Sequence, residues 1–252
     1  MSGLVLSLFP GIGLLDMAFE QEGFCVVRGP DLLWGGDIRT FHPPAGKFDG
    51  VIGGPPCQAF SRLRFLVEHN GYRVADNLIP EFERCAREAA PTWFLMENVP
   101  NAPLPLVGGY VTCGALVCDA HVGGETSRVR RFSFGTREGL KLEIEWLALH
   151  RPDPGPAILA SGGGRDRPVR IGGSGRPKSS GRISKARDLG YKTRKAAAAA
   201  AAAVGQGLPA DYLDKCPFTV AGKISAIGNG VPLPMGRAVA KAVKRALERL
   251  ER

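Results

Sequence analysis

Residues 3–24 read GLVLSLFPGIGLLDMAFEQEGF, and this stretch decides the fold. The apolar run at residues 3–9 is typical of a buried strand, and residues 10–13 form a turn after it. Apolar residues then recur at helical spacing over residues 14–21, and a glycine ends that helix. Residues 24–28 predict a second strand. The order of strand, turn, helix and strand indicates the first unit of an open α/β sheet.

The same alternation continues along the chain. Further strands are predicted at residues 48–53, 92–96, 110–118 and 129–135, and helices at residues 78–90, 196–203 and 235–252. Residues 140–147 alternate apolar and charged side chains, which predicts one more, half-exposed strand. We therefore expect an α/β protein whose sheet carries helices on both faces and holds its chemistry at the carboxyl ends of the strands.

Composition excludes several classes of protein. The chain has 252 residues, of which 44% are hydrophobic, enough for a core. No apolar run approaches the roughly 20 residues of a membrane helix, and the first residues lack the features of a secretory signal. Six cysteines are present without a CxxC pair, so free thiols are favoured over a zinc site or a disulfide framework. We expect a cytoplasmic protein with no membrane contact and no metal.

Positive charge is concentrated in one segment. Residues 151–195 contain twelve Lys and Arg against three acids, a net charge of +9 that equals that of the whole chain. A basic segment on a neutral body indicates a polyanionic partner. A solvated basic loop explains the charge equally well.

Three motifs follow predicted strands. FPGIG at residues 9–13 would let a ligand approach the start of a helix, but it lacks the third glycine of a dinucleotide fingerprint, and a tight turn is the alternative. GGPPCQ at residues 53–58 places Cys57 on a rigid turn, as a nucleophile requires, although a buried structural cysteine is the alternative. Glu97 lies just past the strand predicted at 92–96, where partial burial would raise its pKa and suit it to proton donation, unless it is a solvated strand-end acid.

Taken in order, FPGIG, GGPPCQ and MENVP (residues 96–100) resemble the cytosine-5 DNA methyltransferases. TSRVR at residues 126–130 is similar to the family's Gln-x-Arg-x-Arg, with Thr126 in place of the glutamine. GNGVP at residues 228–232 is similar to Gly-Asn-Ser/Ala-Val-Pro. The resemblance covers roughly residues 1–135 and 196–245.

The resemblance implies a Rossmann-like, S-adenosylmethionine-dependent methyltransferase sheet with a small target-recognition region. Cys57 would add to carbon 6 of a flipped-out cytosine, Glu97 would bind ring nitrogen 3, and Arg130 would contact the base. Carbon 5 then receives the methyl group of S-adenosyl-L-methionine, leaving S-adenosyl-L-homocysteine. The implied catalytic residues are Pro56, Cys57, Gln58, Glu97, Asn98, Arg128 and Arg130.

The implied cofactor residues are Phe9, Gly11, Ile12, Gly13, Asp31, Asp37, Ile38, Pro55, Asn229 and Val231. Asp37 would read the adenine amino group. The family places an acid directly after the second strand, where this chain has Arg28. Asp31 is the nearest acid, and either a ribose contact or a turn cap would explain it.

Double-stranded DNA is the implied partner, and we expect a monomer. Ser61, Arg62 and Arg64 would lie on a loop that closes over the DNA, and Arg165, Arg167 and Arg170 would contact phosphates or guanine edges. Solvated arginines are the alternative. The implied organisation is a catalytic and cofactor-binding domain at 1–138, a basic, Gly-rich recognition region at 139–205, and a returning C-terminal segment at 206–252.

Three other functions fit parts of the sequence. The family has a branch that methylates cytosine in transfer RNA, and that branch has a near-minimal recognition region. A DNA-binding relative without activity is compatible with Thr126, although Cys57 and Glu97 argue against it. A nicotinamide dehydrogenase would require the missing glycine. The compact length suggests a bacterial or phage enzyme, such as the methyltransferase of a restriction-modification system.

Overall fold

A computed structural model describes residues 3–56, 76–147 and 194–250. The strands are β1 (Leu4–Leu8), β2 (Cys25–Arg28), β3 (Gly50–Gly53), β4 (Trp93–Asn98), β5 (Val111–Cys118) and β6 (Val129–Thr136). The α-helices are α1 (Leu14–Gln21), α3 (Ile79–Ala89), α5 (Arg194–Gly205), α6 (Val220–Asn229) and α7 (Leu233–Glu248). Short 3₁₀ turns are η1 (Leu32–Trp34), η2 (Ile38–Thr40) and η4 (Asp119–Val122).

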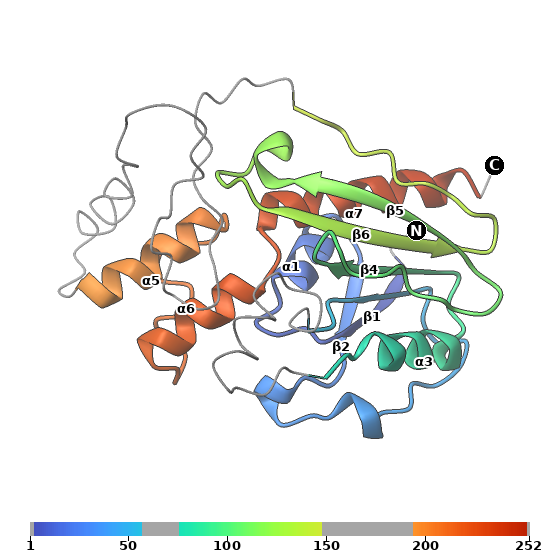
Figure 1. The fold of residues 1–252 in the computed structure, drawn as a ribbon, viewed down its shortest axis with the longest axis horizontal. Coiled ribbons are helices and arrows are strands. Elements are labelled where there is room, and N and C mark those ends of the chain that lie inside the picture. Colours follow the sequence, from blue (N-terminus) through green and yellow to red (C-terminus); the bar gives the residue numbers. More distant parts are fainter. Residues whose placement is uncertain (1–2, 57–75, 148–193, 251–252) are drawn as a thin grey trace.

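The strands form one sheet in the order β2-β1-β3-β4-β6-β5 (Figure 1). The first four strands in this order are parallel, whereas β6 is antiparallel to both β4 and β5. The chain passes from β1 to β2 on one side and then to β3 on the other, which makes the carboxyl end of β1 a topological switch point. Because β6 is antiparallel, its first residues lie at the same edge as the last residues of β4. The predicted α/β sheet is confirmed.

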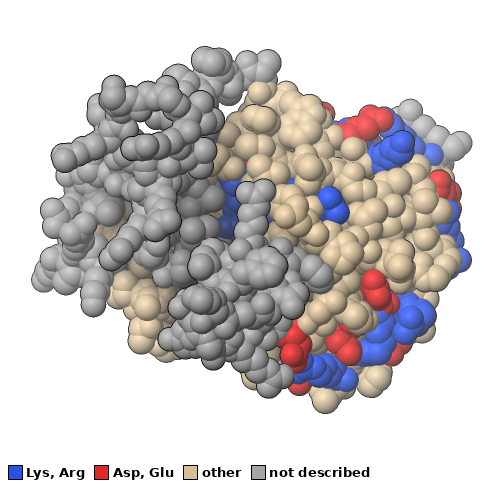
Figure 2. Space-filling model, in the orientation of Figure 1, with Lys and Arg blue, Asp and Glu red and all other residues tan. Residues whose placement is uncertain are grey.

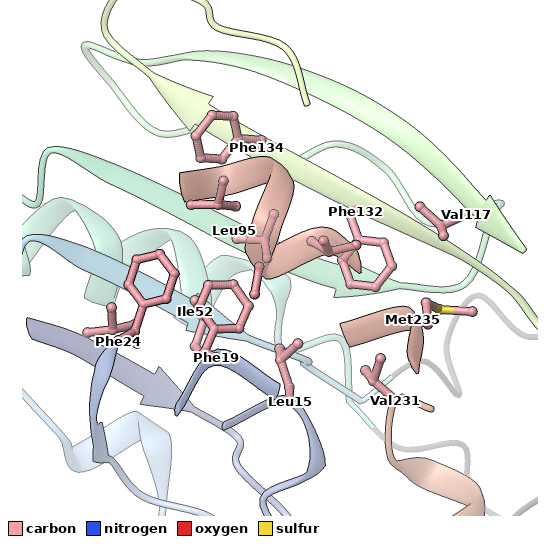
Figure 3. Close-up of a cluster of buried hydrophobic side chains, with 14 of the residues drawn as sticks. Leu15, Phe19, Phe24, Ile52, Leu95, Val117, Phe132, Phe134, Val231 and Met235 are labelled. Atoms are coloured by element: carbon pink, nitrogen blue, oxygen red, sulfur yellow. The ribbon is translucent and has the colours of Figure 1, made fainter. Parts of the chain in front are cut away.

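Helices cover both faces of this sheet. On one face, Phe19 of α1 and Val239 of α7 pack in one cluster with Leu95 of β4, part of which Figure 3 shows. On the other face, Phe82 of α3 packs in a second cluster with Phe94 of β4. Successive residues of β4 therefore enter opposite clusters, and all six of its residues are buried. Burial on both faces explains why such strands read as continuous apolar runs.

The strand predicted at residues 140–147 does not form. Its first three apolar side chains are partly buried against the core, as their alternation suggests, but Trp146 is 53% exposed. The segment instead contacts α7, where Glu143 pairs with Arg249 at 2.6 Å. Apolar and charged residues alternate in this segment because one of its sides packs against the core. No neighbouring strand completes a hydrogen-bonded ladder with it among the described residues.

Several charged side chains on the described surface form ion pairs. Figure 2 shows acidic and basic side chains side by side near α3 and near the end of α7. Arg84 pairs with Glu88 at 2.8 Å on α3, and Arg249 pairs with Glu143. The basic segment at 151–195 lies almost entirely outside the described residues. Among the helices that are described, none has the length and apolarity needed to cross a membrane.

Candidate active site and cofactor pocket

The turn after β1 has a left-handed backbone at three positions. Phe9, Gly11 and Gly13 have φ values of 57°, 55° and 79°. Glycine adopts this region freely, but Phe9 does not, and backbone strain of this kind clusters at functional sites. Gly13 is the N-cap of α1, and no described side chain caps that helix end. The start of α1 therefore offers backbone N–H groups to a polar ligand at the switch point.

A buried carboxylate links α1 to the ends of β1 and β2 next to this turn. Asp16 of α1 accepts hydrogen bonds from Ser7 Oγ at 2.5 Å and from Arg28 Nε at 2.9 Å. Burial raises the pKa of Asp16, and the contacts with Ser7 and Arg28 act in the opposite direction. Gly13 has a φ of 79°, a conformation in which any other residue would be strained, and a Cβ there would also lie 2.6 Å from Arg28 Nη2. This cluster is absent from the sequence prediction, although an aspartate among the apolar residues of the helix is its signal.

Each of the two predicted cofactor aspartates, Asp31 and Asp37, caps a 3₁₀ turn. Asp31 accepts the N–H of Leu33 at 2.7 Å with one oxygen and the N–H of Gly11 at 2.8 Å with the other. Asp31 therefore caps η1, as one of the two explanations has it, and also contacts the turn at Phe9–Gly13 (the glycine turn). The ribose contact stays a prediction. Asp37 caps η2 by accepting the N–H of Arg39 at 3.0 Å.

The other predicted cofactor residues differ in exposure. Ile12, Ile38, Pro55 and Val231 are buried, whereas Asn229 is exposed. The four buried side chains come from four separate segments of the chain. Ile12, Ile38 and Val231 belong to three different core clusters.

The turn after β3 is tied to the end of β4. Asn98 is 1% exposed, and its Nδ2 donates to the carbonyl of Pro55 at 3.2 Å. Its Oδ1 accepts the N–H of Val99 at 2.8 Å. Pro55 and Pro56 directly precede Cys57 and Gln58, which lie outside the described residues. Asn98 thus fixes the backbone that leads into the predicted nucleophile.

Glu97 is a buried acid beside that turn. Its Oε1 pairs with Arg130 Nε at 2.8 Å, and the residue is 8% exposed. Burial raises the pKa of Glu97, while the charges of Arg130 and Arg128 lower it, and the net direction is upward. A Cβ on Gly54 would lie 3.1 Å from Glu97 Oε2, so the glycine at position 54 leaves room for the carboxylate.

The arginine motif reaches Glu97 because β6 is antiparallel to β4. Arg130 lies at the start of β6 and contacts Glu97, whereas Arg128 is 3% exposed and donates to the carbonyl of Gly228 at 2.7 Å. Thr126 stands where the family has glutamine. Its N–H and hydroxyl donate to one carboxylate oxygen of Asp119, at 3.0 and 2.6 Å. Thr126 therefore anchors the turn that precedes the two arginines.

The GNGVP motif at residues 228–232 lies against the glycine turn, more than two hundred residues away in sequence. A Cβ on Gly230 would lie 2.9 Å from a methyl carbon of Leu14, the first residue of α1. The Tyr212 hydroxyl donates to the carbonyl of Ile12 at 3.2 Å. The structure thus brings FPGIG, the end of β4, the arginine motif and GNGVP to one edge of the sheet. Helix α6, which carries Asn229 as its last residue, is absent from the sequence prediction.

Several predicted site residues lie outside the described ranges. They are Cys57, Gln58, Ser61, Arg62, Arg64, Arg165, Arg167 and Arg170. The predicted domain boundaries at 138 and 205 also stay predictions. Within the described part, Ala202 and Ala203 of α5 pack in the same cluster as Ile12 and Leu14, so the end of α5 contacts the glycine turn.

The sheet order, with the motifs gathered at the carboxyl ends of β1, β3 and β4, defines a Rossmann-like methyltransferase fold. The solved structure of the Entamoeba histolytica methyltransferase EhMeth is similar over 100% of both chains, with a TM-score of 0.63 and 14% sequence identity. At that identity the likeness concerns the fold alone.

Sequence relatives narrow the class to a family. The family model for C-5 cytosine-specific DNA methylase matches residues 35–104. Type II methyltransferase M.FnuDI of Fusobacterium nucleatum is 35% identical over 111 residues, which is 38% of this chain and 32% of that protein. M.HgiGI of Herpetosiphon aurantiacus is 32% identical over 120 residues, 39% of this chain and 92% of the relative. The chain belongs to the C-5 cytosine-specific DNA methylase family. It spans about a third of the length of M.FnuDI.

Proposed function

We propose that this chain is a DNA (cytosine-5)-methyltransferase that uses Cys57 as its nucleophile. The observation that carries the proposal is the buried pair of Glu97 and Arg130, 2.8 Å apart, beside the turn that leads to Cys57. An acid with a raised pKa and a fixed cationic partner suits the recognition and protonation of a ring nitrogen at neutral pH. Membership of the family supplies the substrate class.

The residues at the switch point fit S-adenosyl-L-methionine. Gly11 has no heavy atom within 4 Å of the place where a Cβ would stand, and Gly13 begins a helix that no described side chain caps. The carboxylates of Asp31 and Asp37 suit ribose hydroxyls and an adenine amino group. Phe9, Ile12, Ile38, Pro55, Asn229 and Val231 would complete the pocket. When bound, this cofactor supplies an electrophilic methyl group.

The chain's own residues would activate the base. The Cys57 thiolate forms a bond to carbon 6 of cytosine, and a hydrogen bond or proton from Glu97 to nitrogen 3 draws the electron pair into the ring. Carbon 5 would then be nucleophilic enough to accept a methyl group from the sulfonium of S-adenosyl-L-methionine, with S-adenosyl-L-homocysteine as the leaving group. Loss of the carbon 5 proton to a base expels Cys57 and restores the aromatic ring. Arg130 holds Glu97 toward the base, and Arg128 adds positive potential that favours the thiolate.

The target cytosine would have to flip out of the DNA duplex to reach Cys57. Ser61, Arg62 and Arg64 follow the nucleophile in sequence and would contact the opened DNA. Arg165, Arg167 and Arg170 lie in the basic segment and would contact phosphates or guanine edges. These roles rest on the sequence, since all six residues lie outside the described ranges. We propose that one copy of the chain suffices.

A covalent trap tests this function directly. DNA duplexes with 5-fluorocytosine in varied contexts are incubated with S-adenosyl-L-methionine and the chain, because fluorine cannot leave carbon 5 as a proton does. We expect a denaturation-resistant adduct with the wild-type chain and none with Cys57→Ala. Glu143→Gln is the matched control, since Glu143 lies on the surface beside α7, and it should trap like the wild type.

Each outcome of the trap decides between functions. An adduct on fluorinated RNA and not on DNA would assign the activity to RNA. No adduct on either nucleic acid, from a chain that binds the cofactor, would leave a binding protein without catalysis and contradict the proposal. An adduct that persists in Cys57→Ala would assign the nucleophile to another residue.

A further inference from the structure

Gln206 lies directly after α5, where three helices meet. Its side chain is fully buried, and its Nε2 donates to the carbonyl of Ile227 in the last turn of α6, at 3.1 Å. Its backbone carbonyl accepts the N–H of Leu233, the first residue of α7, at 2.9 Å. Its own N–H donates to the carbonyl of Ala203 in α5, at 3.0 Å. One residue therefore connects the end of α5, the end of α6 and the start of α7.

Arg128 holds the same turn of α6 from the side of the sheet. Its Nη1 donates to the carbonyl of Gly228 at 2.7 Å. The last carbonyls of a helix have no partner within the helix and need one elsewhere. Here the carbonyl of Gly228 is taken by Arg128, and the carbonyl of Ile227 accepts the Gly230 N–H at 3.1 Å together with the side chain of Gln206. The end of α6 is therefore fixed from two directions.

The fixed turn faces the predicted cofactor pocket. Ile227 packs in one cluster with Ile12 and Leu14, and Gly230 lies close to the side chain of Leu14. Asn229 stands between these two contacts and is exposed. The position of Asn229 relative to the glycine turn therefore depends on how the end of α6 is held.

Packing alone does not account for a glutamine at this place. Its Oε1 is buried, and among the described residues it has no hydrogen-bond partner. An unsatisfied buried acceptor costs free energy, and an apolar side chain of similar volume would avoid that cost. The useful part of the side chain is therefore its N–H group, which the carbonyl of Ile227 accepts.

We propose that Gln206 is a positioning residue for the cofactor pocket. Its bond to Ile227 fixes the turn that carries Asn229 against the glycine turn of β1, without a contact of its own to the ligand. The inference rests on the proposed function, because the ligand concerned is S-adenosyl-L-methionine.

The test compares cofactor affinity with turnover in Gln206→Met, which keeps the volume and removes the donor. We expect the Kd for S-adenosyl-L-methionine, measured by calorimetry, to rise about tenfold. KM for the cofactor should rise in parallel, while kcat at saturating cofactor should change less than about twofold, because the bound geometry is restored by the ligand. A purely structural role would lower stability without this split between KM and kcat.

Tyr110→Phe is the matched control. The Tyr110 hydroxyl also donates to a backbone carbonyl, that of Pro91, but Pro91 precedes β4 and lies at the opposite edge of the sheet. This variant should lose stability and keep the wild-type Kd. If Gln206→Met does not fold, Gln206→Asn keeps an amide, shortened by one methylene, and is measured below its melting temperature.

The outcomes separate this inference from the proposed function. A folded Gln206 variant with the wild-type Kd, or a Tyr110→Phe variant that loses affinity equally, would overturn the role of Gln206 alone. A wild-type chain that binds no S-adenosyl-L-methionine would overturn the proposed function, and this inference with it.

Discussion

Glu97 is the residue in which burial and neighbouring charge most directly oppose each other. Arg130 contacts it at 2.8 Å, yet burial prevails and its pKa lies above the ordinary value of 4.5. We expect Glu97→Gln to keep the fold and to lower kcat by about 10² to 10⁴-fold, because an amide cannot transfer the proton. Steady-state methylation assays measure the loss. Glu143→Gln, which changes a surface carboxylate, should keep wild-type kcat.

The raised pKa of Glu97 predicts how the stability of the fold depends on pH. A carboxyl group with a raised folded-state pKa binds its proton more tightly in the folded chain than in the unfolded chain. Its contribution to stability is complete below the unfolded value of 4.5 and is lost as pH rises through the folded value. The free energy of unfolding of the wild type, relative to Glu97→Gln, should therefore fall as pH rises above 4.5. Urea titrations of both chains at several pH values measure it, and parallel curves would contradict the shift.

Residues whose role depends on a local motif could be predicted, and residues that pair across the fold could not. Glu97 directly follows the apolar run at 92–96, so its place near the end of β4 could be predicted from its neighbours. Gln206 itself carried no signal in the sequence, and its partner Ile227 lies in a helix that was not predicted. The Asp16 pair with Arg28 likewise joins two elements that only the fold brings together.

At the scale of elements, the turn after β3 has to approach β4 closely. A Cβ on Gly54 would lie 3.1 Å from Glu97 Oε2, so the carboxylate would have to shift by a few tenths of an ångström. We expect Gly54→Ala to fold normally and to lower kcat about tenfold, because small displacements of a catalytic group cost rate. Gly108→Ala is the control, since no atom lies within 4 Å of its Cβ position. Equal kcat in the two variants would show that the contact is unimportant.

Helices α1 and α7 also touch at a glycine. A Cβ on Gly236 of α7 would lie 2.7 Å from Ala18 Cβ of α1. Overpacking costs about 1–3 kcal/mol, which exceeds the gain of at most about 1 kcal/mol from alanine in a helix, so Gly236→Ala should be destabilised. In Gly222→Ala the nearest atoms are 3.4 Å away, and this variant should be neutral or more stable. Chemical denaturation of both variants measures the difference, and a stabilised Gly236→Ala would refute the close approach.

Helices and strands with a clear pattern of apolar residues could be predicted from the sequence. Two other segments show where such a pattern misleads or is too weak. The strands at 48–53 and 92–96 read as apolar runs because helices cover both of their faces. Residues 140–147 alternate like a strand but pack beside α7, because a period of two records one-sided burial and not a hydrogen-bonded neighbour. Helix α6 (Val220–Asn229) has Val220, Ile224 and Ile227 at helical spacing, but it is short and contains two glycines, which weaken its helical signal.

For the whole molecule, the order of the elements determined the fold class, but not how the last strands run. Alternation of strands and helices predicts a parallel sheet, and β2, β1, β3 and β4 follow that rule. The reversal of β6 was not predicted, yet it is what brings Arg130 to Glu97. The candidate site is therefore predictable as a set of motifs, while its contacts depend on the antiparallel strand and on the returning C-terminal segment.

Because the predicted cofactor residues come from both ends of the chain, the ligand should stabilise the molecule as a whole. A ligand at about 100 times its Kd adds about 2.7 kcal/mol to the free energy of unfolding. For a chain of this size, that corresponds to a rise in Tm of about 5–10 °C. We expect S-adenosyl-L-methionine and S-adenosyl-L-homocysteine to give this rise in thermal unfolding, and NAD to give none. A rise with NAD alone would instead favour a nicotinamide enzyme built on the same glycine turn.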